Sequence, residues 1–300
     1  MVEIVGKKRS GITAGVLLIV ICTLWIVPVL GLLITSFRDE NVVNKSGWWT
    51  VFKDPEGMTL SNYKQVLGGK DYTYVNAEGI KVTARSQNLL LAFANSLTVT
   101  VPAVVIPILI AAFAAYGFAW LRFPGRKIFF IIVVALLVVP LQLALIPILR
   151  DYNRLNLKGT YLAVWLAHTG FGLPLATYLL FNYISTIPRS ILESAFCDGC
   201  SHFKIFMRLI LPLSVPALAS FAIFQFLWVW NDLLVAMVFL GTQSKVAVLT
   251  QRLYGLIGYL GEDYHLLTAG AFVSIVLPLA VFIALQRFFV RGLLAGSVKG

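Results

Sequence analysis

The sequence predicts an all-α membrane protein that crosses the bilayer several times. Apolar residues occupy 59% of its 300 positions and charged residues only 12%, and the mean hydropathy is +0.87. A soluble domain has about a quarter of its residues charged, so this chain has too little polar surface to cover its apolar volume in water. The net charge of +11 does not indicate a nucleic-acid partner, because uncharged runs long enough to span a bilayer separate the basic residues.

Six segments are long and apolar enough to cross a membrane as helices, which takes about 20 residues each. They are residues 12–36, 89–121, 128–149, 160–187, 209–244 and 266–286. The first follows the basic residues Lys7, Lys8 and Arg9 but extends well past the apolar core of a signal peptide, so we expect an uncleaved helix. Every segment contains proline, which favours helices that bend.

Six spans place both termini on the same side of the membrane. Seven of the twelve basic residues on the other side lie in the long segment 37–88, where the positive-inside rule is weak. Ten of the 13 acids also lie on that other side. We therefore expect both termini in the cytoplasm. The expected organisation is a tail at 1–11, a first helix at 12–36, an outer loop at 37–88, a membrane core at 89–290 and a tail at 291–300.

The sequence lacks the motifs that would let this chain catalyse a reaction by itself. It contains no phosphate-binding G-x-x-x-x-G-K-S/T loop, no H-E-x-x-H and no G-x-S-x-G. Cys197 and Cys200 form a Cys-x-x-Cys pair, but His202 raises the number of nearby zinc ligands only to three. We expect two small apolar side chains at a turn, and no catalytic residue, metal or cofactor in this chain.

Ionisable residues inside the spans are limited to His168 and Asp232. This is few for an ion-coupled secondary transporter. That class, and a membrane scaffold without transport activity, remain alternatives on the basis of the residues alone.

The predicted cytoplasmic loop at 188–212 is the most informative segment. Ser190 and Glu193 have the spacing of an S-x-x-E capping box, which predicts the start of a short helix. Gly199 is placed to end that helix in a left-handed conformation, and Ser201 to cap a second short helix that runs toward Pro212. The local pattern alone favours a well-capped loop without a partner.

The same loop resembles the one that marks the permease subunits of binding-protein-dependent ABC importers. Its E-S-A-x3-G-x9-L-x-L-P string is similar to their E-A-A-x3-G-x9-I-x-L-P pattern, with Ser194 and Leu209 as mild departures. Similarity to maltose-type carbohydrate permeases extends over nearly the whole chain. It includes Thr59-Leu60-Ser61-Asn62-Tyr63, Asn95-Ser96, Arg122-Phe123-Pro124-Gly125-Arg126, Trp230-Asn231-Asp232 and the tail at 286–300. The segment 37–88 departs from that family in being longer.

The resemblance implies the type I ABC importer fold, with six transmembrane helices and cytoplasmic coupling helices. It implies a permease that moves a carbohydrate across the cytoplasmic membrane of a prokaryote, while separate ATPase subunits bind ATP-Mg. The implied partners are a second homologous permease, a dimer of ATPase subunits, an extracytoplasmic sugar-binding protein and the lipid bilayer. The substrate expected from it is an oligosaccharide or α-glucoside, although the sequence does not identify the sugar.

The resemblance also implies roles for individual residues. Contact with the ATPase is expected at Glu193, Ser194, Ala195, Asp198, Gly199, Leu211 and Pro212. The C-terminal tail is expected between the ATPase subunits, through Gly296, Ser297, Val298, Lys299 and Gly300. The outer loop at 241–265 is expected to reach into the binding protein's sugar cleft, through Gly258, Tyr259, Gly261 and Tyr264.

Two further features are open to more than one interpretation. Asn231 and Asp232 are candidates for the translocation path, because an acid within a span is often functional, but Asp232 would equally fix a helix through hydrogen bonds. Trp48 and Trp49 in the outer loop suit an aromatic belt at the membrane interface or a contact for the binding protein.

Overall fold

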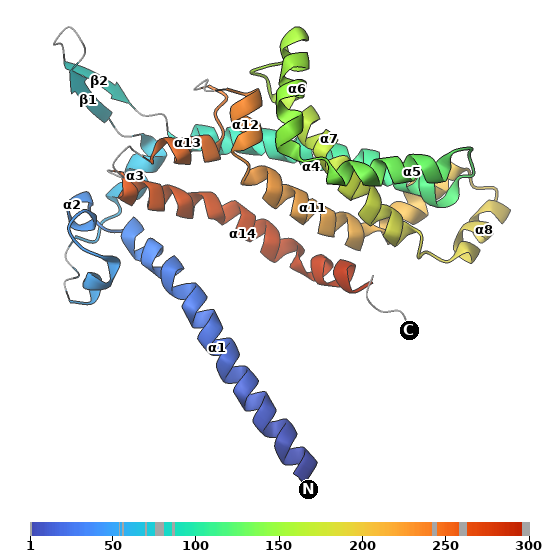
Figure 1. Ribbon diagram of the computed structural model, residues 1–300, viewed down its shortest axis with the longest axis horizontal. Helices are drawn as coiled ribbons and strands as arrows, with labels where there is room; N and C mark the ends of the chain where they lie inside the picture. The colour runs from blue at the N-terminus through green and yellow to red at the C-terminus, as the bar shows by residue number, and fades with distance from the viewer. Residues whose placement is uncertain are drawn as a thin grey trace. The chain divides into compact units, whose positions relative to one another are not determined.

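The computed structural model describes residues 2–53, 55, 57–69, 71–75, 81–85, 88–241, 245–257 and 263–295. Most of this part of the chain is helical, which confirms the predicted fold class (Figure 1). The chain divides into two compact units. One comprises Met1–Leu90 with Leu253–Ser274, and the other comprises Leu91–Arg252 with Ile275–Gly300.

Four uninterrupted helices have the length and hydropathy to cross a bilayer. They are α1 (Val2–Ser36), α4 (Leu89–Trp120), α7 (Tyr161–Ile184) and α14 (Tyr264–Ala295). Two bent pairs of helices pass the same test, and counting each pair as one span gives the predicted six. The first is α5 (Arg126–Ala135) and η2 (Leu136–Val138) with α6 (Leu141–Arg154), and the second is His202–Leu213 with α11 (Val215–Trp230).

The bends of 103° and 70° lie at short breaks between consecutive helices. Pro140 precedes α6 in an extended conformation and has no N–H to donate to the previous turn. Ser214 and Pro216 lie at the second bend. By contrast, Pro102 and Pro107 lie inside α4, which continues through both of them.

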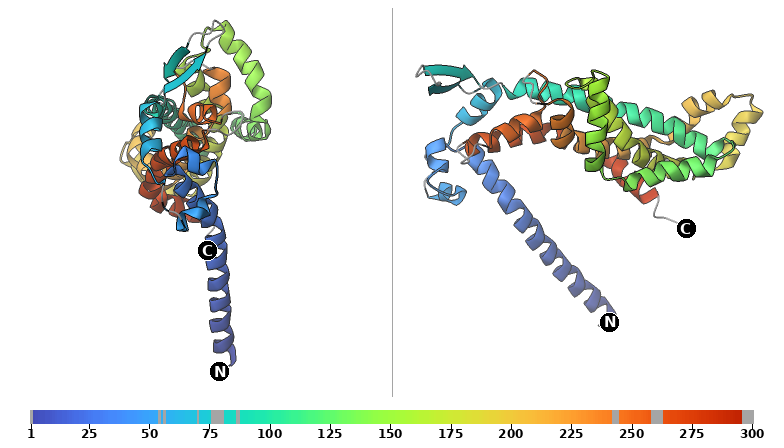
Figure 2. Two further views of the ribbon diagram at one scale, coloured as in Figure 1. Left: turned by 90° about the vertical axis from the view of Figure 1, so that its left-hand side faces the viewer. Right: turned by 45° about the horizontal axis from the view of Figure 1, so that its top comes forward.

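The first unit contains the segment 37–88, which the sequence analysis expected to be an outer loop, and this segment includes helices and strands. After α1, a single helix in both views of Figure 2, it forms α2 (Glu40–Val43), η1 (Trp48–Phe52) and α3 (Ser61–Gly68). Strands β1 (Asp71–Val75) and β2 (Lys81–Arg85) then pair antiparallel, with Asp71 opposite Arg85. The sequence analysis did not predict this hairpin, although the Tyr-Thr-Tyr-Val string of β1 has high strand propensity.

A buried arginine holds this loop together. The guanidinium of Arg38 donates to the carbonyl of Gly47 at 2.8 Å, to Ser46 Oγ at 2.9 Å and to Thr50 Oγ1 at 2.8 Å. The side-chain amide of Asn62 donates to the carbonyl of Arg38 at 2.8 Å. These bonds satisfy a buried charge and fix the start of η1 on the end of α1.

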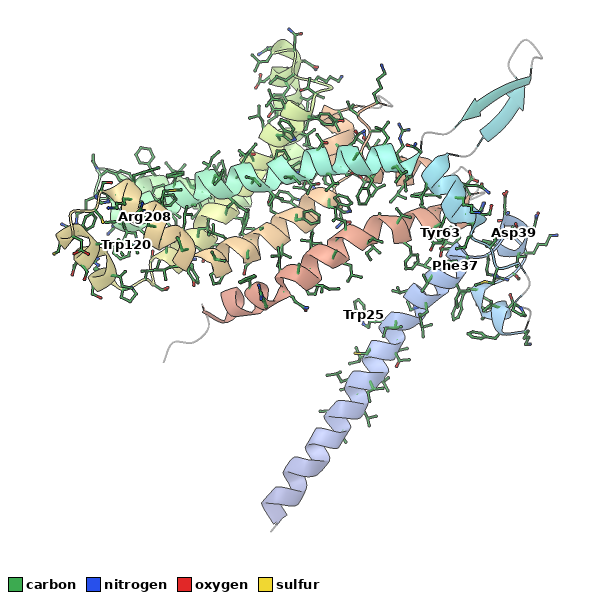
Figure 3. The ribbon with its side chains drawn as sticks, turned by 180° about the vertical axis from the view of Figure 1, so that it is seen from behind. Trp25, Phe37, Asp39, Tyr63, Trp120 and Arg208 are labelled. Atoms are coloured by element: carbon green, nitrogen blue, oxygen red, sulfur yellow. The ribbon has the colours of Figure 1, made fainter. Side chains whose placement is uncertain are left out.

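Aromatic residues complete the outer loop. The rings of Phe37 and Tyr63 lie 5.0 Å apart (Figure 3). The indole of Trp48 packs so closely on Gly31 that a Cβ there would lie 2.7 Å from Trp48 Nε1. Trp49 and Phe52 are exposed, as is Trp25 on α1. Exposure of Trp49 suits both interpretations of the tryptophan pair.

The second unit has α4, α7 and α11 at its centre (Figure 1). Alanines on α4 and α7 are fully buried where these helices pack, and small residues let membrane helices approach closely. One apolar cluster contains Ala111, Ala115, Leu180, Ile184 and Phe221, and it continues into the loop after α7. A second contains Val99, Ala103, Val164, Val235 and Phe239.

The prolines of α4 leave two backbone carbonyls free to accept hydrogen bonds from the neighbouring helices. Pro102 and Pro107 have no N–H, so the carbonyls of Thr98 and Ala103, four residues earlier, lose their helical donors. Trp165 Nε1 on α7 donates to the Thr98 carbonyl at 2.9 Å. Gln225 Nε2 on α11 donates to the Ala103 carbonyl at 3.2 Å. Both freed carbonyls of α4 are therefore bonded to a neighbouring helix.

Gln225 is fully buried and also donates to the carbonyl of His168 on α7, at 3.3 Å. Gly172 makes room for its amide, because a Cβ at Gly172 would lie 2.8 Å from Gln225 Nε2 and 2.9 Å from Oε1. One side chain thus connects three helices, and its place depends on the absence of a side chain at Gly172.

We predict that Gly172→Ala lowers the stability of the protein by about 1–3 kcal/mol, because the new methyl group displaces the Gln225 amide from its two carbonyls. The matched control is Gly170→Ala, two residues away on the same helix, where an added Cβ has no neighbour within 4 Å. Thermal unfolding of the purified protein in detergent measures the stability of both variants. Equal melting temperatures for the two variants would contradict the prediction.

Candidate functional site

The loop after α7 folds into two short helices separated by a glycine, as its sequence predicts. Helix α8 (Arg189–Cys197) is followed by Gly199 at φ +73° and then by α9 (His202–Ile205). The chain continues as η3 (Phe206–Ile210), a turn of π-helix, and α10 (Leu211–Leu213). Ser201 caps α9 as predicted, since its side chain accepts the Lys204 N–H at 3.4 Å.

Helix α8 ends in a Schellman motif around Gly199. The Gly199 N–H donates to the Phe196 carbonyl at 2.9 Å, and the Cys200 N–H donates to the Ala195 carbonyl at 3.0 Å. The left-handed conformation at Gly199 makes both bonds possible and suits glycine because it has no Cβ. Cys200 is partly buried against the apolar core, and Cys197 is an exposed free thiol. In the described ranges, no group of three or more potential ligands could hold a metal.

The predicted capping box of Ser190 and Glu193 is wrong. Helix α8 starts earlier, with Pro188 in the N-cap position and no side-chain cap, because the extended backbone of Pro188 already directs the chain into the helix. Ser190 therefore lies inside the first turn, where its carbonyl accepts the hydroxyl of Ser194 at 2.9 Å. Glu193 is exposed, and its carboxylate has no hydrogen bond or ion pair with any described residue.

Helices α8 and α9 have a buried face and an exposed face. Leu192 and Ala195 are buried and belong to the apolar cluster of the membrane core, and so do Ile205 and Phe206. The opposite face carries Glu193. It also carries two exposed aromatic residues, Phe196 and Phe203, the second of which is 65% exposed. A carboxylate beside exposed aromatic rings is suited to bind another protein.

The loop is also bonded directly to α4. Tyr116 Oη and His202 Nδ1 form a hydrogen bond of 2.8 Å, and the His202 ring lies edge-on against Phe196 at 4.8 Å. Phe206 stacks on Phe113 of α4, with ring centroids 4.3 Å apart. The sequence analysis did not identify Tyr116 or Phe206, since each is separated from its partner by more than 80 residues in the chain.

The remaining residues of the predicted motif lie where η3 meets the second bend. Leu211 begins α10 and is partly buried against the apolar core, and Pro212 follows it. Asp198 occupies the C-cap of α8 and is exposed. The structure therefore places the residues from Glu193 to Pro212 in consecutive short elements, α8 to α10, that pack on the apolar core through Leu192 and Ala195 at one end and Leu211 at the other.

A second polar cluster lies at the other end of α4. Asn95 Nδ2 donates to the carbonyls of Lys245 and Ala247, both at 2.9 Å, and Tyr161 Oη donates to Asn95 Oδ1 at 2.8 Å. Ser96 Oγ accepts the Leu249 N–H at 2.8 Å. The Asn95-Ser96 string therefore fixes the segment that leads into α13 (Leu249–Gly255).

Asp232 lies near this cluster and makes hydrogen bonds within the protein. Its Oδ2 accepts the N–H groups of Val235 at 2.9 Å and Ala236 at 3.2 Å, which fixes the start of α12 (Leu234–Phe239). His168 Nε2 lies 4.0 Å from the same oxygen. Both side chains line a cavity of about 10 Å³, enough for about one water molecule. A sugar does not fit there in this conformation.

Some predicted site residues lie outside the described part of the chain. They are Gly258, Tyr259 and Gly261 of the outer loop and the tail from Gly296 to Gly300. Tyr264 is described, and it is the exposed first residue of α14. Asn231 is exposed, and its side-chain amide donates to the Leu227 carbonyl at 2.8 Å.

Comparisons with known proteins identify the family. Residues 87–295 match the family described as binding-protein-dependent transport system inner membrane component. The chain is 55% identical over 285 residues to the osmoprotective compounds uptake permease protein GgtD of Synechocystis sp., covering 94% of this chain and 90% of that protein. It is 59% identical over 251 residues to the alpha-glucoside transport system permease protein AglG of Rhizobium meliloti, covering 82% of this chain and 62% of that protein.

A solved structure agrees in fold. The chain matches the crystal structure of a bacterial ABC transporter involved in the import of the acidic polysaccharide alginate, with a TM-score of 0.75 and 22% identity, over 94% of this chain and 97% of that one. These matches confirm the resemblance to ABC importer permeases that the sequence motifs indicated. The two alternatives, a secondary transporter and a scaffold without transport activity, are therefore set aside. The chain belongs to the family of binding-protein-dependent transport system inner membrane components, and it is a multi-pass permease subunit of an ABC importer, separate from the ATPase.

Proposed function

We propose that this permease serves the import of a small neutral α-glucoside. The name of the 59% identical relative states alpha-glucoside transport, and the name of the 55% identical relative states uptake of osmoprotective compounds. One kind of molecule fits both names. Sucrose, for example, contains an α-glucosidic bond and is also a protein-stabilising osmolyte.

The proposed assembly contains a second permease, two ATPase subunits and an extracytoplasmic sugar-binding protein. In it, both termini and α8 face the cytoplasm, and α8 docks on an ATPase subunit. The observation that carries this proposal is the two-sided structure of the loop, in which Glu193 and Phe203 are exposed while Leu192 and Ala195 are fixed in the membrane core. Glu193 is free to pair with a basic residue of the ATPase, because it is not used as a helix cap.

ATP hydrolysis is then coupled to movement of the transmembrane helices because α8 is firmly packed on them. When ATP closes the ATPase dimer, α8 moves with its docking partner, and its buried face moves α4 and α7 through the shared apolar cluster. The bond between Tyr116 and His202 carries the same movement from α9 to α4. Pro212 and the tail from Gly296 to Gly300 are assigned to the same interface.

At the outer side of the membrane, the proposed contact with the binding protein lies around residues 245–249, the segment before α13 to which Asn95 and Ser96 are bonded. Tyr254 on α13 is exposed and available for such a contact. We also propose that the outer loop displaces sugar from the binding protein, through Gly258, Tyr259, Gly261 and Tyr264. Asn231 and Asp232 are proposed to line the translocation path. Asp232 would have to release its bonds to α12 before it touched a substrate.

The substrate assignment predicts that uptake discriminates between α-glucosides and β-glucosides. The complete importer, expressed in cells without other glucoside uptake, is expected to accumulate labelled sucrose or trehalose. An excess of unlabelled α-glucoside should compete, whereas the β-glucoside cellobiose should not. Calorimetry on the partner binding protein supplies an independent measurement. Equal competition by cellobiose, or a binding protein with no affinity for α-glucosides, would contradict the assignment.

The coupling assignment predicts that Tyr116→Phe reduces uptake per ATP hydrolysed. The change removes one hydroxyl and hence the bond to His202, worth about 1 kcal/mol, while the ring that packs on Phe206 stays. Tyr178→Phe is the matched control, because Tyr178 is exposed and its hydroxyl has no partner among the described residues. Uptake and ATPase activity are measured together in proteoliposomes. An unchanged ratio in Tyr116→Phe would show that this bond does not contribute to coupling.

A further inference from the structure

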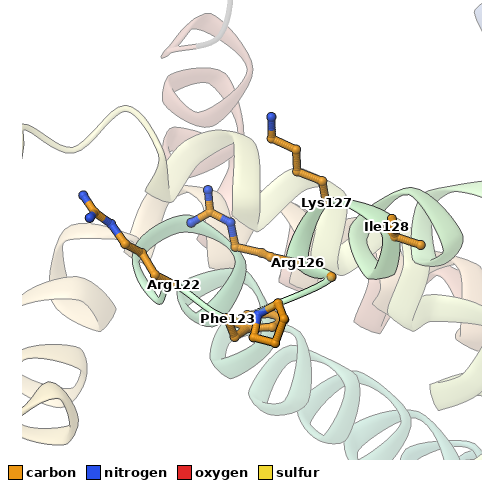
Figure 4. A pocket seen from close by; sticks show the side chains of 7 residues that line it. Arg122, Phe123, Arg126, Lys127 and Ile128 are labelled. Atoms are coloured by element: carbon orange, nitrogen blue, oxygen red, sulfur yellow. The ribbon is translucent and has the colours of Figure 1, made fainter.

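Three basic residues gather at the turn between α4 and α5. Arg122, Arg126 and Lys127 extend to one side of the turn, as Figure 4 shows. Together with the rest of residues 122–128 they line an open hollow of about 610 Å³. The importer function assigned above does not use this hollow.

The charge of the hollow is not neutralised within the described part of the chain. Arg126 Nη1 donates to the Leu121 carbonyl at 3.0 Å, which fixes its guanidinium beside the end of α4. None of the three cations pairs with a carboxylate of any described residue, and no acid lines the hollow. Three positive charges at one turn therefore favour an anionic ligand.

The shape of the turn keeps these charges together. Gly125 has φ +76°, a left-handed conformation that reverses the chain within a few residues. Its carbonyl accepts the Phe129 N–H at 2.9 Å, and a Cβ at Gly125 would lie 3.1 Å from the Phe129 ring. Arg122 before the turn and Arg126 after it are thus held on the same side.

An apolar surface begins where the basic hollow ends. Helix α5 exposes Ile128, Phe129, Ile131 and Ile132, whose side chains are between 52% and 65% exposed. Because α5 belongs to a candidate membrane span, this surface is suited to face hydrocarbon. A cationic hollow continuous with an apolar helix face is complementary to both parts of an amphiphile: an anionic headgroup and its acyl chains.

We propose that residues 122–128 bind the phosphate headgroup of an anionic phospholipid whose acyl chains lie along the exposed face of α5. Arg122, Arg126 and Lys127 contact the phosphate, and Ile128, Phe129 and Ile132 contact the chains. The proposal rests on the proposed topology, in which the turn between the second and third spans faces the cytoplasm together with α8, but not on the identity of the sugar. A lipid at this site stabilises the turn that joins α4 to the next span.

The test uses the purified, assembled importer in a neutral detergent, titrated with phosphatidylglycerol and with phosphatidylcholine of the same acyl chains. Native mass spectrometry counts bound lipid. The variant is R122Q/K127Q, which leaves Arg126 on the Leu121 carbonyl. The matched control is R150Q/K158Q, which removes the same charge. Arg150 lies in α6 and Lys158 lies in the turn after it, and both are exposed and have no partner among the described residues.

We expect saturable binding of phosphatidylglycerol to the wild type and to R150Q/K158Q. We expect the affinity to be about 25-fold lower in R122Q/K127Q, since each basic residue near an anionic headgroup contributes about fivefold. Phosphatidylcholine should bind more weakly, and millimolar inorganic phosphate should not displace the lipid. The proposal is overturned if R122Q/K127Q binds as well as the wild type, if both variants lose affinity equally, if both lipids bind alike, or if inorganic phosphate displaces the lipid. Sugar uptake does not enter these readouts, so their failure leaves the transport assignment intact.

Discussion

Two backbone carbonyl groups of α4, which proline leaves without a helical donor, determine where α7 and α11 are bonded to α4 in the membrane core. In hydrocarbon an unsatisfied backbone carbonyl costs several kcal/mol, so the carbonyls of Thr98 and Ala103 require donors from elsewhere. Trp165 on α7 and Gln225 on α11 supply them. The prolines of α4 therefore specify where its two neighbours attach, and Gly172 provides the space that the second attachment needs.

The same helix connects the two ends of the permease. Asn95 and Ser96 hold the segment before α13, and Tyr116 holds the loop that contains α8 and α9. At 1.5 Å per residue, the 21 helical steps from Asn95 to Tyr116 span about 32 Å, close to the thickness of the hydrocarbon core. In the proposed assembly, a displacement of α8 by the ATPase is transmitted to the segment before α13 through one continuous helix, α4, whose middle is bonded to α7 and α11.

Local features of this architecture were predictable from the sequence, and long-range features were not. The apolar runs and the left-handed Gly199 depend on residues close together in the chain, and so does the Ser201 cap. The capping box at Ser190 was wrong for a local reason, since Pro188 starts the helix earlier. The donors that reach α4 could not be predicted, because Trp165 and Gln225 lie 67 and 122 residues from the carbonyls that they bind. Prolines within an apolar helix indicate that such donors are needed, but not which side chains supply them.

The central claim is that the exposed face of α8 is a cytoplasmic docking surface fixed to the membrane core. Cysteine cross-linking at position 193 tests it most directly, in a chain whose native Cys22, Cys197 and Cys200 are replaced by alanine. We predict that E193C forms a cross-link with the ATPase subunit, and that a membrane-impermeant maleimide labels it in inside-out vesicles made without the ATPase but not in intact cells. Labelling in intact cells, or the absence of any cross-link to the ATPase in a complex that still transports, would contradict the account.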